Sequence, residues 1–387
     1  MNGAHAPDDA QLEEAARRLA AGRLVAFPTE TVYGLGADAS DPAAVARIYG
    51  AKGRPSNHPV IVHLAPGARV EYWAARVPAQ ARALMDAFWP GPLTLILPRA
   101  PHIPDAVSGG QDSIGLRCPS HPVAQALLAR FAGLKGGHGG VAAPSANKFG
   151  QVSPTCAEHV RAEFPELDDD ALMVLEGGPS QVGIESTIVD LSRLEQGVGP
   201  AILRPGHITA AQIGRVLRIA PDGLLPGHEP GDGATCAGCA VSGESERHAG
   251  REVDERGGAR RMDDVAQGKP RAPRVSGSLK AHYAPRTPLQ VLPRGGIRLL
   301  LQSAAGNDER MACVVFGPPE SAFASSPGVD WFAAQPDPDA YARELYALLR
   351  RLDQGGYARL VFEQPPRSAP WQAVNDRLGR AAAAFGG

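Results

Sequence analysis

The first candidate for chemistry is a pair of cations, Lys52 and Arg54, which Gly53 separates and Pro55 follows. A loop that glycine and proline stiffen can direct both charges at one polyanion, with a point charge from lysine and a planar fork from arginine. A solvated basic turn has the same composition. The pattern therefore indicates either a phosphate site or an ordinary surface turn.

A hydroxyl and an amide follow an apolar run at residues 141–143. Ser145 and Asn147 come directly after a proline, so we expect both side chains at the tip of a strand. Ser145 and Lys148 also match the S-x-x-K motif of serine acyl-transferases, but the S-D-N and K-T-G motifs that accompany it do not occur. A serine acyl-transferase stays a minor alternative to a polar binding site.

Hydroxyl and carboxylate groups also gather after the apolar run at residues 24–27. Thr29, Glu30 and Thr31 precede two glycines within residues 28–36, and such a stretch can line a small polar pocket or form a turn with capping hydroxyls. The glycines match G-x-G-x-x-A. They neither directly follow the strand nor open a helix, so a dinucleotide-binding loop is not predicted.

Charged side chains interrupt several apolar runs, at Arg117, Arg204 and the pair Glu185 and Ser186. An arginine inside an apolar strand must be paired or face a ligand, so these residues indicate either structural ion pairs or a substrate site. His63 lies inside another apolar run. A core histidine with satisfied hydrogen bonds is the alternative to a ligand-binding role there.

The elements that must position these residues alternate between short strands and helices. Apolar runs predict strands at 24–27, 60–64, 93–97, 113–117, 141–143, 173–175, 186–191 and 201–204. Periodicity and capping residues predict helices at 11–21, 41–49, 78–88, 121–131, 154–163 and 208–217. Ser153 is expected to cap the helix at 154–163, whose N-terminus would favour an anion. A mixed α/β domain is therefore predicted over residues 10–220.

The second half of the chain changes composition twice. Residues 221–286 are expected to form a flexible linker and hinge, because Gly, Arg, Glu, Asp and Ser dominate their first part. Residues 287–387 are expected to form a smaller, doubly wound (Rossmann-like) α/β domain. Its expected strands are 289–292, 311–316 and 359–363, and its expected helices are 339–353 and 371–385.

The composition of the chain narrows its class. The 387 residues include 45 glycines and 36 prolines, and 43% are hydrophobic against 21% charged, which is typical of a globular, turn-rich protein. A net charge of −2 gives no bulk field for nucleic acid or an anionic membrane. We predict a cytoplasmic protein without membrane contact, since no long apolar run or basic leader occurs.

Cysteines and glycine-rich loops indicate no further site. The chain holds five scattered cysteines, of which Cys236 and Cys239 form a C-x-x-C pair in the expected linker. One such pair lacks the other two ligands of a structural zinc, so no metal site is predicted. The chain contains no G-x-x-x-x-G-K-[ST] motif either, so any nucleotide site is not a P-loop.

Taken in order, the motifs resemble the YrdC-like family, and more closely its two-domain members, the threonylcarbamoyl-AMP synthases. The resemblance rests on P-T-E-T-V-Y-G-L at 28–35, K-G-R-P at 52–55, V-I-V-H at 60–63, G-L-R at 115–117, A-P-S-A-N at 143–147, E-S-T-I-V-D at 185–190 and L-R-P-G at 203–206. It is strongest over residues 10–220 and extends to H-Y-A-P at 282–285 and to residues 371–380. It implies a YrdC-like twisted mixed sheet with helices for the first domain.

The resemblance also implies an activity, that of a nucleotidyltransferase. L-threonine, bicarbonate and ATP would give threonylcarbamoyl-AMP and pyrophosphate, with Mg²⁺ accompanying ATP but no dedicated protein cage for it. The product would pass to a tRNA-modifying transferase complex that acts on an adenosine beside the anticodon, and weak contact with tRNA itself is also implied. Adenylyl transfer needs alignment and neutralised phosphate charge, and the cation pair fits that need.

The same resemblance gives each candidate residue a role. The catalytic set that would hold the triphosphate is Lys52, Arg54, Ser145 and Asn147. Threonine would contact Thr31, His63, Arg117, Ala143 and Ser186. ATP would contact Arg54, His58, Ser113, Ser145, Ser153, Arg204, His282 and Tyr283. The chain departs from the family at position 58, which is usually Asn, and at the hinge, where residues 276–283 keep only part of P-G-M-K-Y-R-H-Y.

A double-stranded RNA- or tRNA-binding module without turnover is the alternative from another class, because single-domain relatives look suited to RNA. The net charge of −2 argues against this as the main role.

Overall fold

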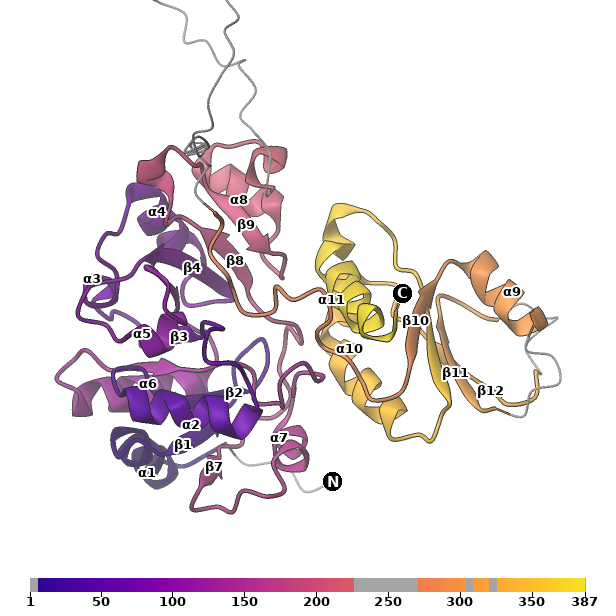
Figure 1. Cartoon of the computed structure of the whole chain (residues 1–387), viewed down its shortest axis with the longest axis horizontal. Coiled ribbons are helices and arrows are strands. Elements are labelled where there is room, and N and C mark those ends of the chain that lie inside the picture. Colours follow the sequence, from indigo (N-terminus) through magenta and orange to yellow (C-terminus); the bar gives the residue numbers. More distant parts are fainter. Residues whose placement is uncertain (1–5, 226–270, 304–308, 320–325, 387) are drawn as a thin grey trace, which may run out of the picture.

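The computed structural model describes residues 6–225, 271–303, 309–319 and 326–386. The chain forms two α/β domains that lie side by side (Figure 1). The segment 271–286 runs between them along the first domain. The α/β classes expected for both domains are confirmed.

The N-terminal domain is built on a mixed sheet with the strand order β7-β1-β2-β6-β3-β5-β4-β8-β9. Its strands are β1 (Leu24–Phe27), β2 (Gly34–Asp38), β3 (Ile61–Leu64), β4 (Leu93–Pro98), β5 (Ser113–Arg117), β6 (Gly140–Ala142), β7 (Leu172–Val174), β8 (Thr187–Asp190) and β9 (Ala201–Arg204). Three strand pairs are parallel, namely β1 with β7, β3 with β5, and β4 with β8. The other pairs are antiparallel, which makes this the twisted mixed sheet that the sequence predicts.

Helices cover both faces of this sheet. They are α1 (Asp9–Ala20), α2 (Pro42–Lys52), α3 (Val70–Trp73), α4 (Ala79–Phe88), α5 (Asp105–Ser108), α6 (Pro122–Leu134), α7 (Ala157–Glu163) and α8 (Ala210–Leu217). The alternation along β1 shows the division, because Val25 and Phe27 pack with α1 and α6 while Leu24 and Ala26 join the core on the opposite face. Short 3-10 turns occur at Leu194–Gln196 and Pro221–Leu224.

Strand β2 is the strand that the sequence patterns missed in this domain, and the short helices α3 and α5 were not predicted either. The residues of β2 were expected to form a pocket-lining stretch or a turn, because two glycines disfavour a strand. The structure pairs β2 with β1 and β6. Gly36 is needed there, since a Cβ would lie 2.8 Å from the Phe27 ring and 3.0 Å from the Val25 carbonyl oxygen. Glycine thus lets β2 pass close beneath a buried aromatic ring.

The helix expected at 154–163 begins later than predicted. Helix α7 starts at Ala157 with Cys156 at its N-cap. The Ser153 hydroxyl does not cap it, because that hydroxyl donates instead to Glu185 Oε1 at 2.6 Å. The predicted capping role of Ser153 is wrong, since its hydroxyl donates a hydrogen bond to a buried carboxylate from a distant segment.

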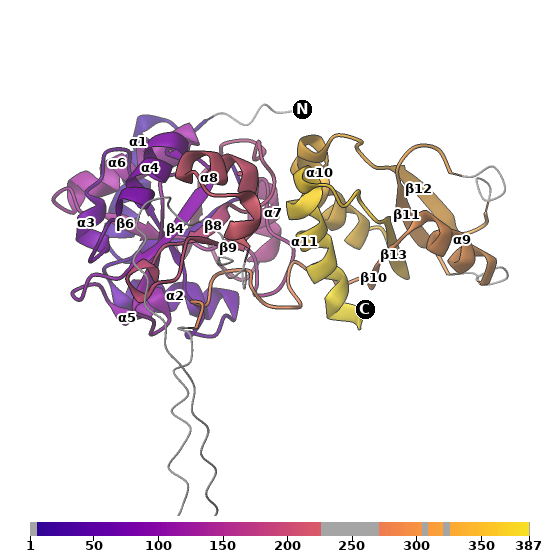
Figure 2. The ribbon, with the colours of Figure 1, turned by 90° about the horizontal axis from the view of Figure 1, so that it is seen from above.

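The C-terminal domain is a parallel sheet in the order β10-β13-β11-β12. The strands are β10 (Leu289–Leu292), β11 (Met311–Val315), β12 (Val329–Ala333) and β13 (Arg359–Glu363), and the helices are α9 (Arg294–Ser303), α10 (Pro338–Asp353) and α11 (Gln372–Ala382), with 3-10 turns at Ala369–Trp371 and Ala383–Phe385. The sequence patterns did not include β12 or α9. Helices α10 and α11 cover the face toward the N-terminal domain and α9 covers the other (Figure 2), which confirms the doubly wound arrangement.

The range expected as a flexible linker and hinge is packed at both described ends. Leu224 is fully buried, so the first domain continues past residue 220. Val275, His282 and Tyr283 are also buried, in the segment 271–286. Cys236 and Cys239 lie outside the described residues. No helix of the described chain is long and apolar enough to cross a membrane.

Candidate active site

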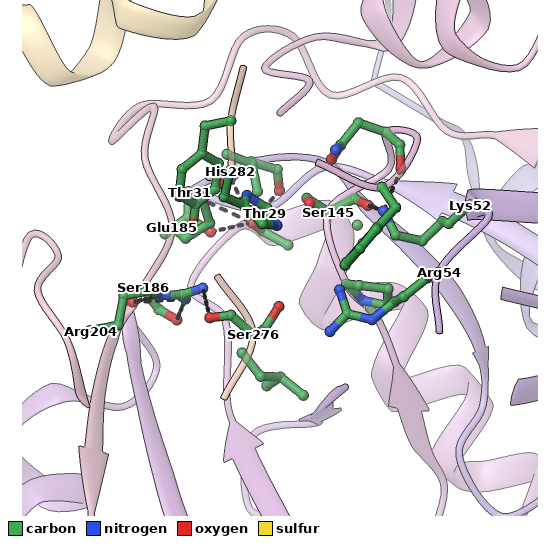
Figure 3. A pocket seen from close by; sticks show the side chains of 18 of the residues that line it. Thr29, Thr31, Lys52, Arg54, Ser145, Glu185, Ser186, Arg204, Ser276 and His282 are labelled. Carbon is green, nitrogen blue, oxygen red and sulfur yellow. Dashed lines mark hydrogen bonds between the residues drawn. The ribbon is translucent and has the colours of Figure 1, made fainter. Parts of the chain in front are cut away.

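A pocket opens at the tips of the central strands, and the segment 271–286 borders it (Figure 3). Most of the predicted site residues line it: Thr31, Lys52, Arg54, His63, Arg117, Ala143, Ser145, Asn147, Ser186, Arg204, His282 and Tyr283. The chain order scatters these positions over more than 250 residues. The mixed sheet and the segment after it therefore bring the predicted groups to one place.

Helix α2 positions the two cations. Asp41 caps its first turn, and Gly53 ends it in the left-handed region with φ of 61°. That ending lets Lys52, the last helical residue, and Arg54, the residue after the cap, both face the pocket (Figure 3).

Backbone carbonyls, rather than carboxylates, hold these cations. Lys52 Nζ donates to the Ser145 carbonyl at 2.5 Å and to the Asn147 carbonyl, and Arg54 Nη2 donates to the Pro59 carbonyl at 2.8 Å. No ion pair joins either cation to a carboxylate within the described parts of the chain. Burial lowers the pKa of Lys52 well below its usual value, with Arg54 adding to the effect, and burial lowers the pKa of Arg54 to about 10. The pair is thus a positive site without an ion-paired carboxylate, although Glu163 opposes the lowering of the Lys52 pKa from farther away.

The loop after β6 supplies oxygen atoms beside the cations. Asn147 donates from its side-chain nitrogen to the carbonyls of Lys148 and Gln151, at 2.7 and 2.9 Å. Its Oδ1 is buried and has no hydrogen-bond partner among the described residues. The nitrogen contacts therefore fix the amide with an unused acceptor. Lys148 Nζ contacts the Ala51 carbonyl and Glu166, so this lysine is not the partner of Ser145 that an S-x-x-K enzyme requires.

Arg117 is already partly occupied. Its Nη2 lies 2.7 Å from Glu30 Oε1, and its Nε donates to the Gly91 carbonyl at 3.3 Å. The Nη2 contact is an ion pair by distance, although its angle does not meet hydrogen-bond geometry. Only the third nitrogen of the guanidinium, Nη1, makes neither a hydrogen bond nor an ion pair with a described residue, so it is the one left to bind a ligand. Glu30 also accepts from the Ser120 amide at 3.1 Å.

His63 is a neutral side chain beside Arg117. Burial, with the Arg117 charge adding to it, lowers the pKa of His63 to about 3. Its Nδ1 lies 3.3 Å from the Ile61 carbonyl. The histidine lines the pocket and is also buried in the sheet, so the two interpretations of this strand histidine are compatible.

Arg204 is held by main-chain oxygens of its neighbours. Its Nη2 donates to the Ser186 carbonyl at 2.9 Å and to Ser186 Oγ at 3.1 Å, and its Nη1 donates to the Ser276 carbonyl at 3.0 Å. Ser186 Oγ also lies 2.7 Å from Thr94 Oγ1. Of the two alternatives for the strand arginines, a structural ion pair therefore holds for Arg117, whose partner is Glu30. Arg204 instead donates to carbonyl oxygens and to the Ser186 hydroxyl.

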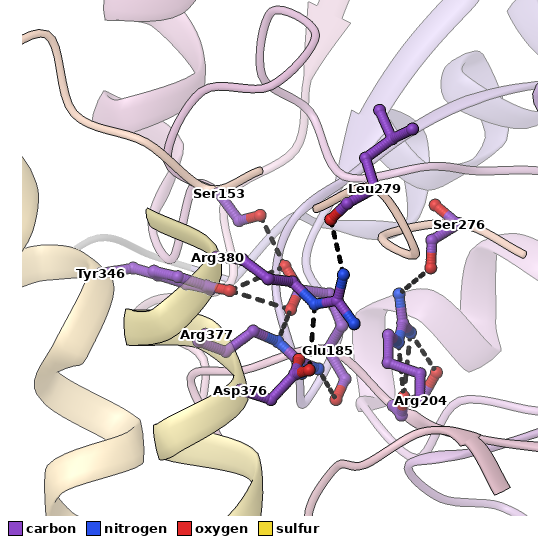
Figure 4. Close-up of polar contacts among 10 residues, drawn as sticks. Ser153, Glu185, Arg204, Ser276, Leu279, Tyr346, Asp376, Arg377 and Arg380 are labelled. Atoms are coloured by element: carbon purple, nitrogen blue, oxygen red, sulfur yellow. Dashed lines mark hydrogen bonds and ion pairs between the residues drawn. The ribbon is translucent and has the colours of Figure 1, made fainter. Parts of the chain in front are cut away.

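Glu185 is the functional candidate to which the sequence analysis assigned no role. It accepts from Ser153, from Tyr346 OH at 2.9 Å and from Arg377 Nε at 2.8 Å, and the last two residues belong to the C-terminal domain (Figure 4). Burial raises the pKa of Glu185, but the charges of Arg377 and Arg204 and the hydrogen bond from Ser153 outweigh burial and lower this pKa to about 2. The available signal was a carboxylate at the start of an apolar strand.

Three predicted ATP-contacting residues do not line the main pocket. Ser153 is fully buried against Glu185. His58 stacks edge-on against Phe149, with ring centroids 5.3 Å apart. Ser113 lines a smaller pocket, which adjoins the first one and shares Ile61 and Ser276 with it.

Comparison with known proteins shows the family of this chain. The sequence profile described as "Telomere recombination" matches residues 17–206, and the profile described as "Threonylcarbamoyl-AMP synthase, C-terminal domain" matches residues 208–383. A Mycobacterium tuberculosis (strain H37Rv) relative is 40% identical over 199 residues, which are 51% of this chain and 85% of the relative. The chain belongs to the threonylcarbamoyl-AMP synthase family.

Two other members of this family are similar over about half of this chain. The threonylcarbamoyl-AMP synthase of Pyrococcus abyssi is 42% identical over 219 residues (54% of this chain, 61% of the relative), and that of Bacillus subtilis is 45% identical over 211 residues (54% and 57%). The matched region thus spans about six-tenths of the length of these relatives. The crystal structure of Pyrococcus abyssi Sua5 complexed with L-threonine shares the fold, with a TM-score of 0.71 and 28% identity over 98% of this chain and 96% of that one.

Proposed function

We propose that this chain is an L-threonylcarbamoyladenylate synthase, which condenses L-threonine, bicarbonate and ATP to threonylcarbamoyl-AMP and pyrophosphate. The observation that carries the proposal is one pocket in which two cations without carboxylate partners share the lining with Arg117, His63 and Ser186. The first group suits a triphosphate, and the second suits a small amino acid. The Pyrococcus abyssi relative complexed with L-threonine supports the amino-acid assignment.

The positive charges of Lys52 and Arg54 support a role for this pair in binding the phosphates of ATP. Lys52 and Arg54 lie in a buried setting that disfavours their charged forms, so a bound polyanion would stabilise those charged forms and be held strongly. Their carbonyl contacts fix them before substrate arrives. Such fixed cations neutralise the charge that develops as pyrophosphate leaves.

The adenosine end of ATP would extend into the adjoining pocket. Ile61, Ile96, Ile188 and Val275 form an apolar cluster there, which can pack against a planar base. Ser113 lies at the same place and supplies a hydroxyl. Arg204, held by Ser186 and Ser276, would lie between the two pockets on the phosphate path.

Threonine would bind through its carboxylate at Arg117 Nη1 and through its hydroxyl and amine near Thr31, His63 and Ser186. The neutral imidazole of His63 can accept or donate a hydrogen bond without adding charge. The amine would take up carbon dioxide from bicarbonate as a carbamate, losing one proton. A carbamate oxygen would then attack the α-phosphorus as the bond to pyrophosphate breaks, which makes the reaction a nucleotidyl transfer.

Mg²⁺ is proposed as the companion of ATP. The unused buried acceptor Asn147 Oδ1 is the kind of oxygen that this ion prefers, and Ser145 lies beside it. Among the described residues, no group of three His, Cys, Asp or Glu side chains could hold a metal by itself. The residues thus fit an ion that the phosphates carry, with Asn147 and Ser145 as protein ligands, and the ion would neutralise phosphate charge.

The activity is tested by pyrophosphate release from the purified chain. We expect release only when ATP, L-threonine and bicarbonate are all present, with threonylcarbamoyl-AMP identified by mass spectrometry. Release that does not depend on threonine would contradict the assignment. Salt-dependent tRNA binding without any turnover would favour the RNA-binding alternative instead. The downstream transfer of the product to a tRNA-modifying complex is part of the same proposal.

A further inference from the structure

Glu185 joins the two domains through a fully buried contact. Arg377 of α11 donates through Nε to Glu185 Oε2 at 2.8 Å, and its side chain has 0% exposure. Tyr346 of α10 donates its hydroxyl to the same carboxylate, at 2.9 Å from Oε2 and 3.2 Å from Oε1. The C-terminal domain therefore supplies two donors to a carboxylate of the N-terminal domain (Figure 4).

The same carboxylate belongs to the wall of the pocket. Glu185 lines it, and the next residue, Ser186, holds Arg204 through its carbonyl and hydroxyl. Arg377 Nη2 also lies 3.4 Å from the Glu185 carbonyl oxygen. A shift of Glu185 would thus move the main chain at Ser186, which is a proposed threonine contact. It would also move Arg204, a proposed ATP contact that Ser186 holds.

Arg377 also contacts the segment that borders the pocket. Its guanidinium carbon lies 5.2 Å from the centre of the Tyr283 ring, and Tyr283 has a left-handed φ of 63°. Left-handed backbone is unfavourable for tyrosine and persists only where surrounding contacts enforce it. The C-terminal domain therefore fixes two neighbouring parts of the pocket through one side chain.

We propose that Arg377 and Tyr346 are positioning residues for the reaction, which hold Glu185, Ser186 and Tyr283 in place, so that the C-terminal domain completes the substrate pocket. The inference rests on the proposed function. It assigns the C-terminal domain a part in substrate binding, although none of the described residues of that domain lines the pocket.

Charge supports this role. Arg377 and Tyr346 face Glu185 from the C-terminal domain, Arg204 faces it from β9, and His282 and Tyr283 face it from the segment 271–286. With Arg377 present, the pKa of Glu185 stays near 2 despite burial. Without Arg377, burial would raise that pKa, and protonation of the carboxyl would release its acceptor contacts at a higher pH than in the unchanged chain.

The closing experiment uses the full chain and the variant Tyr346→Phe. This variant removes one hydroxyl and keeps the ring, so we expect a KM for threonine that is about 3- to 10-fold higher, with kcat changed less. Tyr341→Phe is the matched control, because Tyr341 lies on the same helix and packs on Phe316 and Trp371 within its own domain. The control should keep the KM of the unchanged chain.

A second variant, Arg377→Gln, tests the charge. We expect a loss of kcat/KM of at least about tenfold and an acidic limb of the pH–rate profile displaced to higher pH, with partial recovery in Arg377→Lys. If Arg377→Gln does not fold, Tyr346→Phe decides alone. An unchanged threonine KM in Tyr346→Phe would overturn the inference while leaving the proposed function intact.

A separate readout covers failure of the proposed function. If the unchanged chain releases no threonine-dependent pyrophosphate, hydrogen exchange of the backbone amides near Ser186 and Tyr283 replaces the kinetic measurement. Faster exchange there in Tyr346→Phe, but not in Tyr341→Phe, supports the positioning role. Equal exchange in the two variants overturns it.

Discussion

Lys52 and Arg54 on one side of the pocket are held by backbone carbonyls, whereas Glu185 on the other side is held by side chains from two domains (Figure 3). The carbonyls leave the two positive charges without an ion-paired carboxylate, and Arg377 compensates the negative charge of Glu185. A charge held only by dipoles remains available to an incoming anion. A charge that is neutralised within the fold instead fixes geometry, and the two sides of the pocket therefore divide binding from positioning.

The largest expected effect tests the neutralised side. Glu185→Ala leaves the Arg377 guanidinium buried without its carboxylate, and we expect the free energy of unfolding to fall by about 3–5 kcal/mol. Urea unfolding measures the loss. Glu163→Ala is the control, because Glu163 forms another ion pair with the C-terminal domain, 3.0 Å from Arg350, with both side chains 12% exposed. An equal loss in both variants would contradict the special place of Glu185.

The next effect tests the side of the two cations. Arg54→Ala should lower the rate of pyrophosphate release by about 100-fold or more, because a fixed cation beside the phosphates is lost. Its free energy of unfolding should change far less than that of Glu185→Ala. Arg47→Ala is the matched control, since Arg47 lies on α2 but donates to the Gly22 carbonyl instead. A normal rate in Arg54→Ala would remove this arginine from the site.

The smallest expected effect concerns two buried histidines, one from the sheet and one from the segment 271–286. Burial lowers the pKa of His63 to about 3, with Arg117 adding to it; burial also lowers the pKa of His282 to about 3, with Glu185 opposing and Arg54 adding to the effect. Between pH 6.5 and about 3, the unfolded chain binds protons that the folded protein does not. This part of the stability is complete above pH 6.5 and is lost as the pH falls.

For each histidine, the expected loss approaches about 1.4 kcal/mol per pH unit once the pH lies well below 6.5, and it is smaller between pH 7 and 6. Urea unfolding at pH 7, 6 and 5 measures it, and His282→Gln should show a shallower dependence than the unchanged chain. If the two proteins showed the same dependence of unfolding free energy on pH, burial would not lower the pKa of His282 in solution.

The two pairs Lys52 and Arg54, and Ser145 and Asn147, could be found in the sequence because each pair lies within three consecutive residues. Asp41 and Gly53 begin and end α2, and these local caps fix where Lys52 and Arg54 emerge. Strand β2 was not predictable in the same way. Its glycines reduce the strand signal, and the reason for them is a ring on a neighbouring strand.

The sequence by itself determined the two α/β domains and the order of the motifs, and it singled out the cation pair that we propose for phosphate, since these depend on local patterns of side chains. Only the tertiary structure decided which buried charge pairs with which. Arg117 forms an ion pair with Glu30, and Ser153 donates a hydrogen bond to Glu185. Glu185 in turn pairs with Arg377, which lies 192 residues away in the sequence. The partner of a buried charge depends on which segments the core packs together, and spacing along the chain does not encode that choice.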